Sequence, residues 1–361
     1  MAVKYYNIQD DYRLYPDAWL YAVWSARGPG KTYSTLADCI EDLDGNSKRF
    51  IFIKRTLGDI ELMCSRFDND SDISPFNPLN RDKGWDIYPV FIDKKNGLAA
   101  FYHCTINEDG KPEPYGNLLG WIIAASVAPK YKGFNMDADV IIFDEFIPKP
   151  WERVNHNEGD AILDFYMTVK RDRAKRGKKT ILVLLANATS LTSPLFRSLR
   201  LIDIAAEMDI KGIEYSYLPT GVMLHQLPSG VYNAASDDNE EVGIEAHMKD
   251  TAWGQMAFGG HFGYNDLTCI GKVNLKGYVP IASYSYNGQD SYIYRKEGKY
   301  YICHSKAKCR KHYNLARESE QKLFFADYVL QIRDAGIEDK VVYESYSDYD
   351  LINNYRKVFT L

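Results

Sequence analysis

Long hydrophobic runs and paired cysteines are both missing from this chain of 361 residues. No apolar stretch approaches the roughly 20 residues that a membrane-spanning helix requires, so we expect no membrane partner. The amino terminus, MAVKYYNIQDD, is polar and has no apolar segment of the kind that marks a signal peptide. The six cysteines form no C-x-x-C pair and fit no standard zinc spacing. They are therefore predicted to be reduced thiols in a protein of the cytoplasm.

The composition carries no strong charge of either sign. The net charge is −5, and apolar residues make up 45% and charged residues 26% of the chain, which is ordinary for a globular protein. This balance does not indicate a nucleic-acid-binding protein, although a local basic patch is compatible with it. The length exceeds that of one typical core and predicts two domains, or one large domain with appendages.

Five short apolar runs alternate with helix-like segments in the first half of the chain. Continuous apolar strands of this kind are typical of a parallel sheet that helices cover on both faces. We therefore predict an α/β fold with a mostly parallel sheet. The segment 57–115 reads as irregular apart from a hairpin in VFIDKKNGLAAFYH. The apolar runs lie at residues 19–24, 50–54, 120–126, 139–146 and 180–186.

The composition and the hydrophobic pattern of the sequence change after about residue 205. The acidic string DDNEE stands in a stretch rich in Gly, Pro, Ser and Asn, which is typical of a linker. Tyrosine-rich alternating segments follow and predict antiparallel strands, before an amphipathic helix over 317–335. These features predict an α/β domain over 1–228, a linker region over 229–262 and a smaller α+β domain over 263–361.

A glycine-rich loop, SARGPGKT, joins the first apolar run to the first helical segment. Such a P-loop wraps its backbone N–H groups around phosphate oxygens at a helix N-terminus. Its lysine would reach the β- and γ-phosphates and its threonine would ligate Mg²⁺, so ATP and Mg²⁺ are the expected ligands. The pattern begins with Ser25 instead of glycine, which an ordinary φ at that residue would permit; a chance glycine-rich turn is the alternative. The predicted nucleotide-binding residues are Arg27, Gly28, Pro29, Gly30, Lys31 and Thr32.

A second motif, VIIFDE, is an apolar strand that ends in two carboxylates. Asp144 suits Mg²⁺ coordination, together with Thr32. Glu145 is placed to orient and polarise an attacking water, which is the work of a general base. A solvated strand end with two acids is the alternative, and the four apolar residues before it make that unfavourable. A small-molecule kinase does not need the second acid, so Glu145 favours hydrolysis.

Asn187 directly follows the apolar run TILVLLA. A polar side chain at the carboxyl end of a parallel strand points into the crevice where ligands bind. It could hydrogen-bond the γ-phosphate or the attacking water and sense their state. An ordinary turn or helix-cap asparagine explains the sequence equally well.

A basic run lies between the acidic strand and the Asn187 strand. Seven of the ten residues from 170 to 179 are basic. One arginine could enter the ATP site of a neighbouring subunit, and the others could contact nucleic-acid phosphates. A solvated helix end, whose cations suit the helix dipole, is an equally good explanation. The candidates for nucleic-acid contact are Lys130, Lys132, Arg173, Lys175 and Arg176.

In this order, the strings SARGPGKT, FIKR, IIFDEF, TVKRDR and LANATS resemble those of the DNA-packaging ATPases of small tailed phages of the phi-29-like type. These are P-loop ring ATPases with an added catalytic glutamate. The similarity covers most of the first 200 residues, and DEF and TVxRxR are its most specific parts. The resemblance assigns Asp144 to the metal, Glu145 to the catalytic base and Asn187 to the sensor. It places Arg171 at the position of the trans-acting arginine, with Arg173 as the fallback.

The resemblance also implies partners and a location. It implies a homo-oligomeric ring, a pentamer in this family, that docks at the portal of a prohead and drives double-stranded DNA into the preformed capsid. The protein would act in the host cytoplasm and transiently on the prohead, with a structural RNA as a further partner. A cellular DNA translocase of the same ATPase class, a small-molecule P-loop kinase and a regulatory ATPase are the alternatives.

The family's C-terminal domain is similar to a nuclease fold of the RNase H type. We expect no nuclease activity here, because Asp266, Asp290 and Asp327 are scattered along the sequence. A basic cluster near Tyr300, Tyr301 and Tyr313 suits contact with nucleic acid or the portal, and a solvated hairpin end is the alternative. The cluster comprises Lys306, Lys308, Arg310 and Lys311.

Overall fold

Two units make up the chain in the computed structural model. The first comprises Met1–Leu195 and Met208–Tyr264, and the second comprises Phe196–Glu207 and Asn265–Leu361. The sequence-based boundaries do not foresee that residues 196–207 join the second unit. Of the predicted linker, residues 229–243 lie outside the described part of the chain. The structure describes residues 5–41, 48–65, 73–131, 136–149, 154–228, 244–248, 250–254 and 267–359, and the single residues Glu152, Ala257, Phe262 and Asn265.

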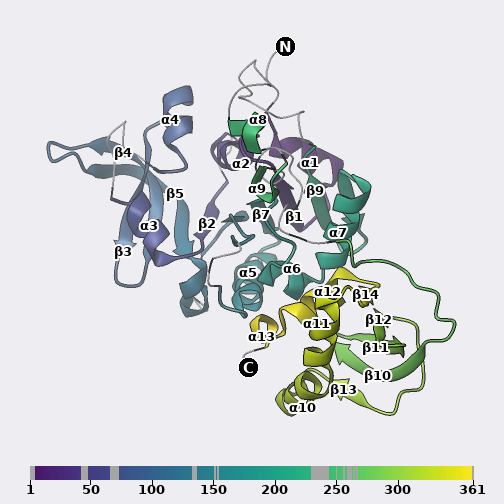
Figure 1. Ribbon diagram of the computed structural model, residues 1–361. Helices are drawn as coiled ribbons and strands as arrows, with labels where there is room; N and C mark the ends of the chain where they lie inside the picture. The colour runs from purple at the N-terminus through teal and green to yellow at the C-terminus, as the bar shows by residue number, and fades with distance from the viewer. Residues whose placement is uncertain are drawn as a thin grey trace. The chain divides into compact units, whose positions relative to one another are not determined.

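A nine-stranded sheet forms the centre of the first unit (Figure 1). Its order is β3-β4-β5-β2-β6-β7-β1-β9-β8. Six neighbouring strands of this sheet are mutually parallel, namely β5, β2, β6, β7, β1 and β9. This confirms the predicted mostly parallel sheet. The strands are β1 Leu20–Ser25, β2 Phe50–Lys54, β3 Ile87–Asp93, β4 Leu98–Ile106, β5 Pro112–Ala124, β6 Val140–Asp144, β7 Ile181–Asn187, β8 Tyr215–Leu218 and β9 Val222–Gln226.

The central strands are buried because their side chains are apolar on both faces. Every residue of β1, β6 and β9 is buried, as a parallel sheet between helices requires. Gly120 of β5 allows the ring of Phe50 to lie across it, since a Cβ at that position would meet the ring at 2.6 Å. The helices of this unit are α1 Ile8–Leu14, α2 Lys31–Ile40, α3 Leu57–Met63, α4 Asn77–Lys83, the 3₁₀ helix η1 Ala125–Tyr131, α5 Glu158–Ala174, α8 Ile244–Met248 and α9 Ala252–Gly254. Helices α6 Pro194–Leu199 and α7 Ile202–Lys211 contain most of the residues 196–207 that belong to the second unit.

The segment 57–115 is more regular than its polar composition suggests. The predicted hairpin is confirmed as β3 and β4, but the rest of the expectation was wrong, because α3 and α4 are helices and β5 begins at Pro112. Thr56 and Asp59 form a reciprocal capping box that starts α3. Helix α4 has a proline in its first turn and ends at Lys83, and its C-cap Gly84 has a φ of 69°.

The second unit contains a five-stranded sheet of order β13-β10-β11-β12-β14. The tyrosine-rich strands β10, β11 and β12 are antiparallel neighbours, as predicted. The fold class, an α/β core with a smaller α+β unit, is therefore confirmed. The elements are β10 Val279–Tyr286, β11 Gln289–Lys296, β12 Lys299–Cys303, β13 His312–Asn314, α10 Glu318–Phe324, the π-helical turn η3 Phe325–Val329, α11 Leu330–Ile337, β14 Val341–Tyr343, α12 Tyr346–Asn353 and α13 Tyr355–Val358.

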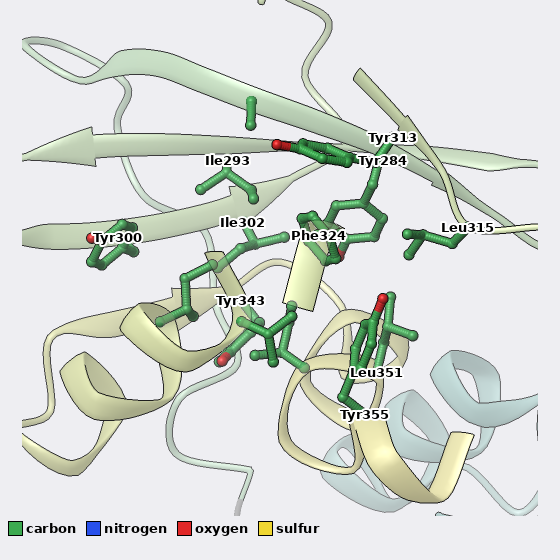
Figure 2. Close-up of a cluster of buried hydrophobic side chains, with 14 of the residues drawn as sticks. Tyr284, Ile293, Tyr300, Ile302, Tyr313, Leu315, Phe324, Tyr343, Leu351 and Tyr355 are labelled. Carbon is green, nitrogen blue, oxygen red and sulfur yellow. The ribbon is translucent and has the colours of Figure 1, made fainter. Parts of the chain in front are cut away.

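The tyrosines of this unit build its core. Figure 2 shows Phe324, Leu351 and Tyr355 of the helices packed toward Ile293 and Ile302 of the sheet. Tyr300, Tyr301 and Tyr313, which stand near the basic cluster in the sequence, are at most 5% exposed, so their rings belong to the core and are not available to a nucleic acid. A role of the basic cluster itself stays a prediction. All six cysteines of the chain are free thiols. Among the described residues, no helix combines the length and apolarity needed to span a bilayer.

Two of the three aspartates examined above as possible metal ligands of a nuclease, Asp290 and Asp327, form hydrogen bonds within the second unit. Asp290 accepts a hydrogen bond from Ser285, and Asp327 accepts from Lys311 and Tyr313. Asp266 lies outside the described residues. The lack of nuclease activity stays a prediction.

A buried carboxylate in the second unit predicts a pH dependence of stability. Asp348 accepts hydrogen bonds from Tyr284, Ser291 and Ser345, and it lies 3.2 Å from Nε2 of His304. Burial would raise the pKa of Asp348, but its donors outweigh burial and lower it. The hydrogen bond to Asp348 raises the pKa of His304 against the effect of burial.

The stabilising effect of the pair should therefore be largest between pH 3.8 and 6.5, the ordinary pKa values of the two groups. It is lost as the pH rises through the raised pKa of His304 or falls through the lowered pKa of Asp348. We expect His304→Asn to lower the melting temperature more at about pH 5.5 than at about pH 8.5. His312→Asn is the matched control, because His312 lies against Ser283 and Ser285. Equal losses at both pH values would contradict the assignment.

Candidate active site

Three adjacent strands bring the predicted site residues together. Strand β7 lies between β1 and β6, and all three are parallel. Their carboxyl ends therefore meet at one edge of the sheet, where ligands of open α/β sheets bind. Ser25, which opens the P-loop, pairs with Asn187 in the strand register. Asp144 pairs with Leu185 of the same central strand.

The P-loop takes the backbone shape that its glycines permit. Gly28 and Gly30 have φ angles of 94° and 87°, in the left-handed region that glycine tolerates best. Gly30 is also the N-cap of α2, so the N–H groups of the first turn point toward the loop. Ser25 does not have a positive φ, which explains why the missing glycine is tolerated. This geometry suits an anion with several oxygens.

Lys31 lies at the first position of α2 and is buried. Its Nζ donates to Ser25 Oγ and to the carbonyl of Ala26 at 3.2 Å, and lies 3.5 Å from Oδ1 of Asn187. Burial lowers the pKa of Lys31 to about 7, although the charge of Asp144 opposes this shift. Phosphate oxygens near the amine would favour its charged form.

Asp144 and Thr32 face each other across the P-loop. The hydroxyl of Thr32 donates to Oδ1 of Asp144 at 3.0 Å. Carboxylate and hydroxyl oxygens are the donors that Mg²⁺ prefers, and one or two protein ligands beside phosphate oxygens are its usual share. The two side chains therefore fit a magnesium ion held together with a nucleotide.

Glu145 has an unusual backbone and an accessible carboxylate. Its φ is 57°, which is uncommon for a residue other than glycine, and such conformations concentrate at functional sites. Its side chain is 58% exposed. The side chain lines a small cavity with Arg27, Lys149, Asn187 and Thr189. The structure thus brings together a carboxylate, an amide and two cations beside the P-loop.

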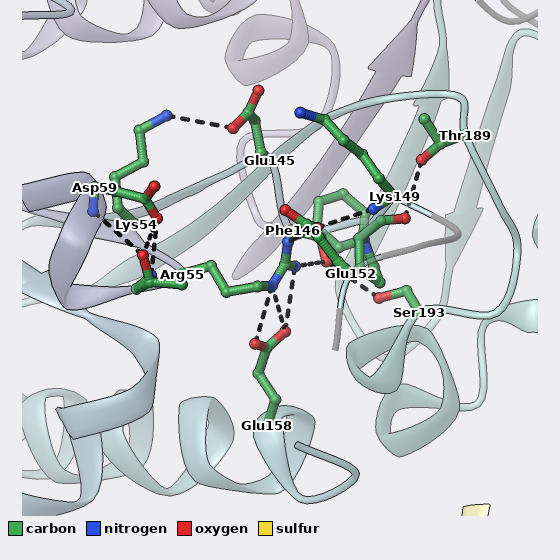
Figure 3. Close-up of polar contacts among 12 residues, drawn as sticks. Lys54, Arg55, Asp59, Glu145, Phe146, Lys149, Glu152, Glu158, Thr189 and Ser193 are labelled. Atoms are coloured by element: carbon green, nitrogen blue, oxygen red, sulfur yellow. Dashed lines mark hydrogen bonds and ion pairs between the residues drawn. The ribbon is translucent and has the colours of Figure 1, made fainter. Parts of the chain in front are cut away.

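Lys54 and Arg55, at the end of β2, were missed as site residues. Nζ of Lys54 lies 2.7 Å from Oδ2 of Asp144. It also lies 3.7 Å from Oε2 of Glu145 (Figure 3). Burial alone would lower the pKa of Lys54, but Asp144 and Glu145 outweigh it and raise the pKa. The sequence did contain a signal for them, because two cations directly follow the apolar string FIFI. The strand that ends there is a neighbour of the acidic strand.

The basic run divides into free and structural cations. Arg171 and Lys175, at the carboxyl end of α5, are exposed. Arg176 is exposed as well and pairs with Asp137 at 3.1 Å. Arg173 is 2% exposed and bonds Asp137, Asp139 and the carbonyl of Lys179. The assignment of Arg173 to DNA contact or to a neighbouring ATP site was therefore wrong, because its guanidinium is already satisfied inside the fold.

The structure describes one of the two lysines that precede the acidic strand. Lys130 is exposed on η1. Lys132 lies outside the described residues.

A cleft of about 620 Å³ opens beside the P-loop. One wall is the amino-terminal segment, where Tyr6 N–H donates to the carbonyl of Pro29 and the ring of Tyr5 lies over Gly30. Tyr33 of α2 and Arg81 of α4 line the cleft as well. Its volume and its aromatic lining suit a planar, partly apolar ligand group.

Comparison with solved structures shows a shared fold. The phi-28 gp11 DNA packaging motor is 19% identical over 99% of this chain and 98% of that chain, with a TM-score of 0.61. The bacteriophage phi-29 viral genome packaging motor assembly is 20% identical over 98% of this chain and 99% of that chain, with a TM-score of 0.64. No protein-family model and no curated protein matches the sequence. The resemblance inferred from the motifs is thus confirmed for the fold.

Proposed function

We propose that this chain is a ring ATPase that drives double-stranded DNA into a preformed viral capsid. The observation that carries the proposal is the meeting of the P-loop, Asp144–Glu145 and Asn187 at one sheet edge. The same chain shares its fold over nearly its whole length with two DNA-packaging motors. A phosphate-binding loop beside an acid that can activate water supports hydrolysis, and the fold supports the coupling to DNA.

ATP would bind with its triphosphate in the P-loop. The backbone N–H groups at Gly28 and Gly30 and the first turn of α2 would hold the phosphate oxygens. Lys31 would leave its contacts with the loop oxygens and pair with the β- and γ-phosphates. Thr32 and Asp144 would hold Mg²⁺, which neutralises developing charge on the phosphates when it is bound.

Hydrolysis would begin with a water held by Glu145. The water oxygen bonds to the γ-phosphorus as the bond between that phosphorus and the β,γ-bridging oxygen breaks, and the Glu145 carboxylate takes the water's proton. ADP leaves with the bridging oxygen, and the proton passes on to solvent or phosphate. Asn187, which lies on the same cavity as Glu145, would hydrogen-bond the γ-phosphate or the water. Lys54, which lies 2.7 Å from Asp144 and 3.7 Å from Glu145, would hold the two carboxylates in place.

Partner contacts belong to the assembled ring. Arg171 is exposed at the end of α5 and would reach the ATP site of the neighbouring subunit. Lys130, Lys175 and Arg176 are exposed cations that would face DNA phosphates. The second unit, with its exposed basic cluster, would dock at the portal of the prohead or on a structural RNA.

ATP turnover with and without double-stranded DNA tests the proposal. We expect slow hydrolysis by the protein alone and a clear acceleration by DNA in the presence of the portal-bearing capsid. ATP use that requires a small phosphate acceptor would point instead to a kinase, and binding without turnover would point to a regulatory switch.

The cleft beside the P-loop predicts where the nucleoside binds. Replacing Tyr5 and Tyr33 together by alanine should weaken ATP binding roughly tenfold, because stacking on a base contributes about 1–3 kcal/mol. Binding of inorganic tripolyphosphate, which has no base, should not change. Tyr217→Ala removes an exposed tyrosine of β8 and is the control. Equal losses for ATP and tripolyphosphate would place the base elsewhere.

A further inference from the structure

Arg55 is a buried cation next to the site that the mechanism above does not use. It follows β2 at the sheet edge and is 9% exposed. Its guanidinium reaches in three directions (Figure 3). One nitrogen donates to the carbonyl of Phe146 at 2.9 Å, and others lie 3.1 Å from carboxylate oxygens of Glu152 and Glu158.

These contacts join two segments that matter for catalysis. Phe146 directly follows Glu145, and Glu158 is the first residue of α5. Glu152 also accepts a hydrogen bond from the backbone N–H of Lys149, at 2.9 Å. A single guanidinium therefore ties the end of β2, the segment after Glu145 and the start of α5 into one hydrogen-bonded group.

The backbone after Glu145 is held on both sides. The N–H of Phe146 donates to the carbonyl of Leu185 in β7, and its carbonyl accepts from Arg55. Glu145 keeps a positive φ, and a strained residue persists only where its surroundings fix it. A carboxylate that must meet a water within hydrogen-bond reach needs such fixing, because a misplacement of about 1 Å can cost roughly 100-fold in rate.

Burying the charges of this network costs free energy, which indicates that the network has a function beyond stability. Burial raises the pKa of Glu158 even though the charge of Arg55 opposes the shift. A buried ion pair is often no more stabilising than apolar residues of similar size. The guanidinium of Arg55 has five N–H donors in a fixed plane and can pair with a carboxylate through two of them, whereas a lysine ammonium is a compact point charge.

We propose that Arg55 is a positioning residue that fixes Glu145 and ties it to helix α5. This rests on the proposed function of Glu145 as the general base. Helix α5 has 17 residues and is about 25 Å long, with Arg171 in its last turn. The link from Arg55 to Glu158 therefore connects the catalytic carboxylate of one subunit to the helix that presents Arg171 to the next.

Glu158→Gln tests the proposal, with Asp137→Asn as the matched control. Both variants turn a carboxylate into an amide, and both carboxylates pair with a buried arginine of the same unit. We expect Glu158→Gln to lower kcat by about 10- to 100-fold while the Kd for ATP changes less than about twofold. Asp137→Asn should lower the melting temperature without changing kcat.

A double variant separates positioning from simple loss of stability. If Arg55 acts through Glu145, Glu158→Gln should cause no further loss of kcat in a Glu145→Gln background. Additive losses would overturn the proposal, and so would full activity in both Glu158→Gln and Arg55→Lys. If Glu158→Gln does not fold, Glu152→Gln is the second variant, because it removes the more exposed of the two carboxylates that pair with Arg55. It should still lower kcat about threefold. An unchanged kcat in Glu152→Gln would count against the role of Arg55. A wild-type protein that does not hydrolyse ATP would instead refute the proposed function.

Discussion

Glu145→Gln is expected to bind ATP as tightly as the wild type and to hydrolyse it about 1,000-fold more slowly. The amide has nearly the same shape, so contacts made to bound ATP should survive. It cannot take a proton from water, so the transition state loses its general base. Kd from a fluorescent ATP analogue and kcat from phosphate release, measured on the same preparation, would separate the two effects.

Lys31→Ala is the contrasting variant. It removes the amine that would pair with the phosphates, so ATP binding itself should be lost. Turnover of Glu145→Gln within about tenfold of the wild-type rate would remove Glu145 from its role as base.

Arg171→Ala should leave ATP affinity unchanged and abolish the acceleration that comes with ring assembly on DNA. An arginine delivered in trans commonly contributes 10³-fold or more to phosphoryl transfer. Arg27 and Arg55 line the cavity beside Glu145, and Arg55 is already paired with Glu152 and Glu158. We therefore expect a cation from a neighbouring subunit to meet the charge that develops on the γ-phosphate. Lys175→Ala, an exposed cation one turn further along the chain, is the control and should affect DNA affinity more than kcat.

Mixing the two inactive variants gives the sharper test. In a ring of Arg171→Ala and Glu145→Gln subunits at equal amounts, roughly a quarter of the interfaces join an intact Arg171 to an intact Glu145. These interfaces should hydrolyse ATP, so activity should reappear on mixing. If both variants co-assemble and no activity returns, Arg171 does not act in trans.

The parts of the fold that the sequence predicts best are those with continuous apolar strands. The strands at 50–54 and 140–144 are apolar on both faces, which leaves little choice but a covered parallel sheet. The segment 57–115 was mistaken for irregular chain because its turn residues hide α3 and α4. The start of β5 was missed for a similar reason, since PEPYGN combines prolines and a glycine with polar residues.

The site is predictable where a motif fixes both residue type and place. The P-loop and Asp144–Glu145 are local strings, and their meeting with Asn187 follows from parallel strand order. Lys54 and Arg55 could not be assigned, because their partners lie about 90 to 100 residues away in sequence. Arg173 shows the opposite error, since a charge run does not reveal which of its members turns inward.

Protection of DNA inside a capsid tests the central claim most directly. The protein, double-stranded DNA, ATP and portal-bearing capsids of its own virus would be incubated, and DNA resistant to added nuclease would be measured. We predict that protected DNA accumulates with ATP and the wild-type protein, and that none accumulates with Glu145→Gln. ATP hydrolysis at the wild-type rate by protein bound to the capsid, without any protected DNA, would contradict the account.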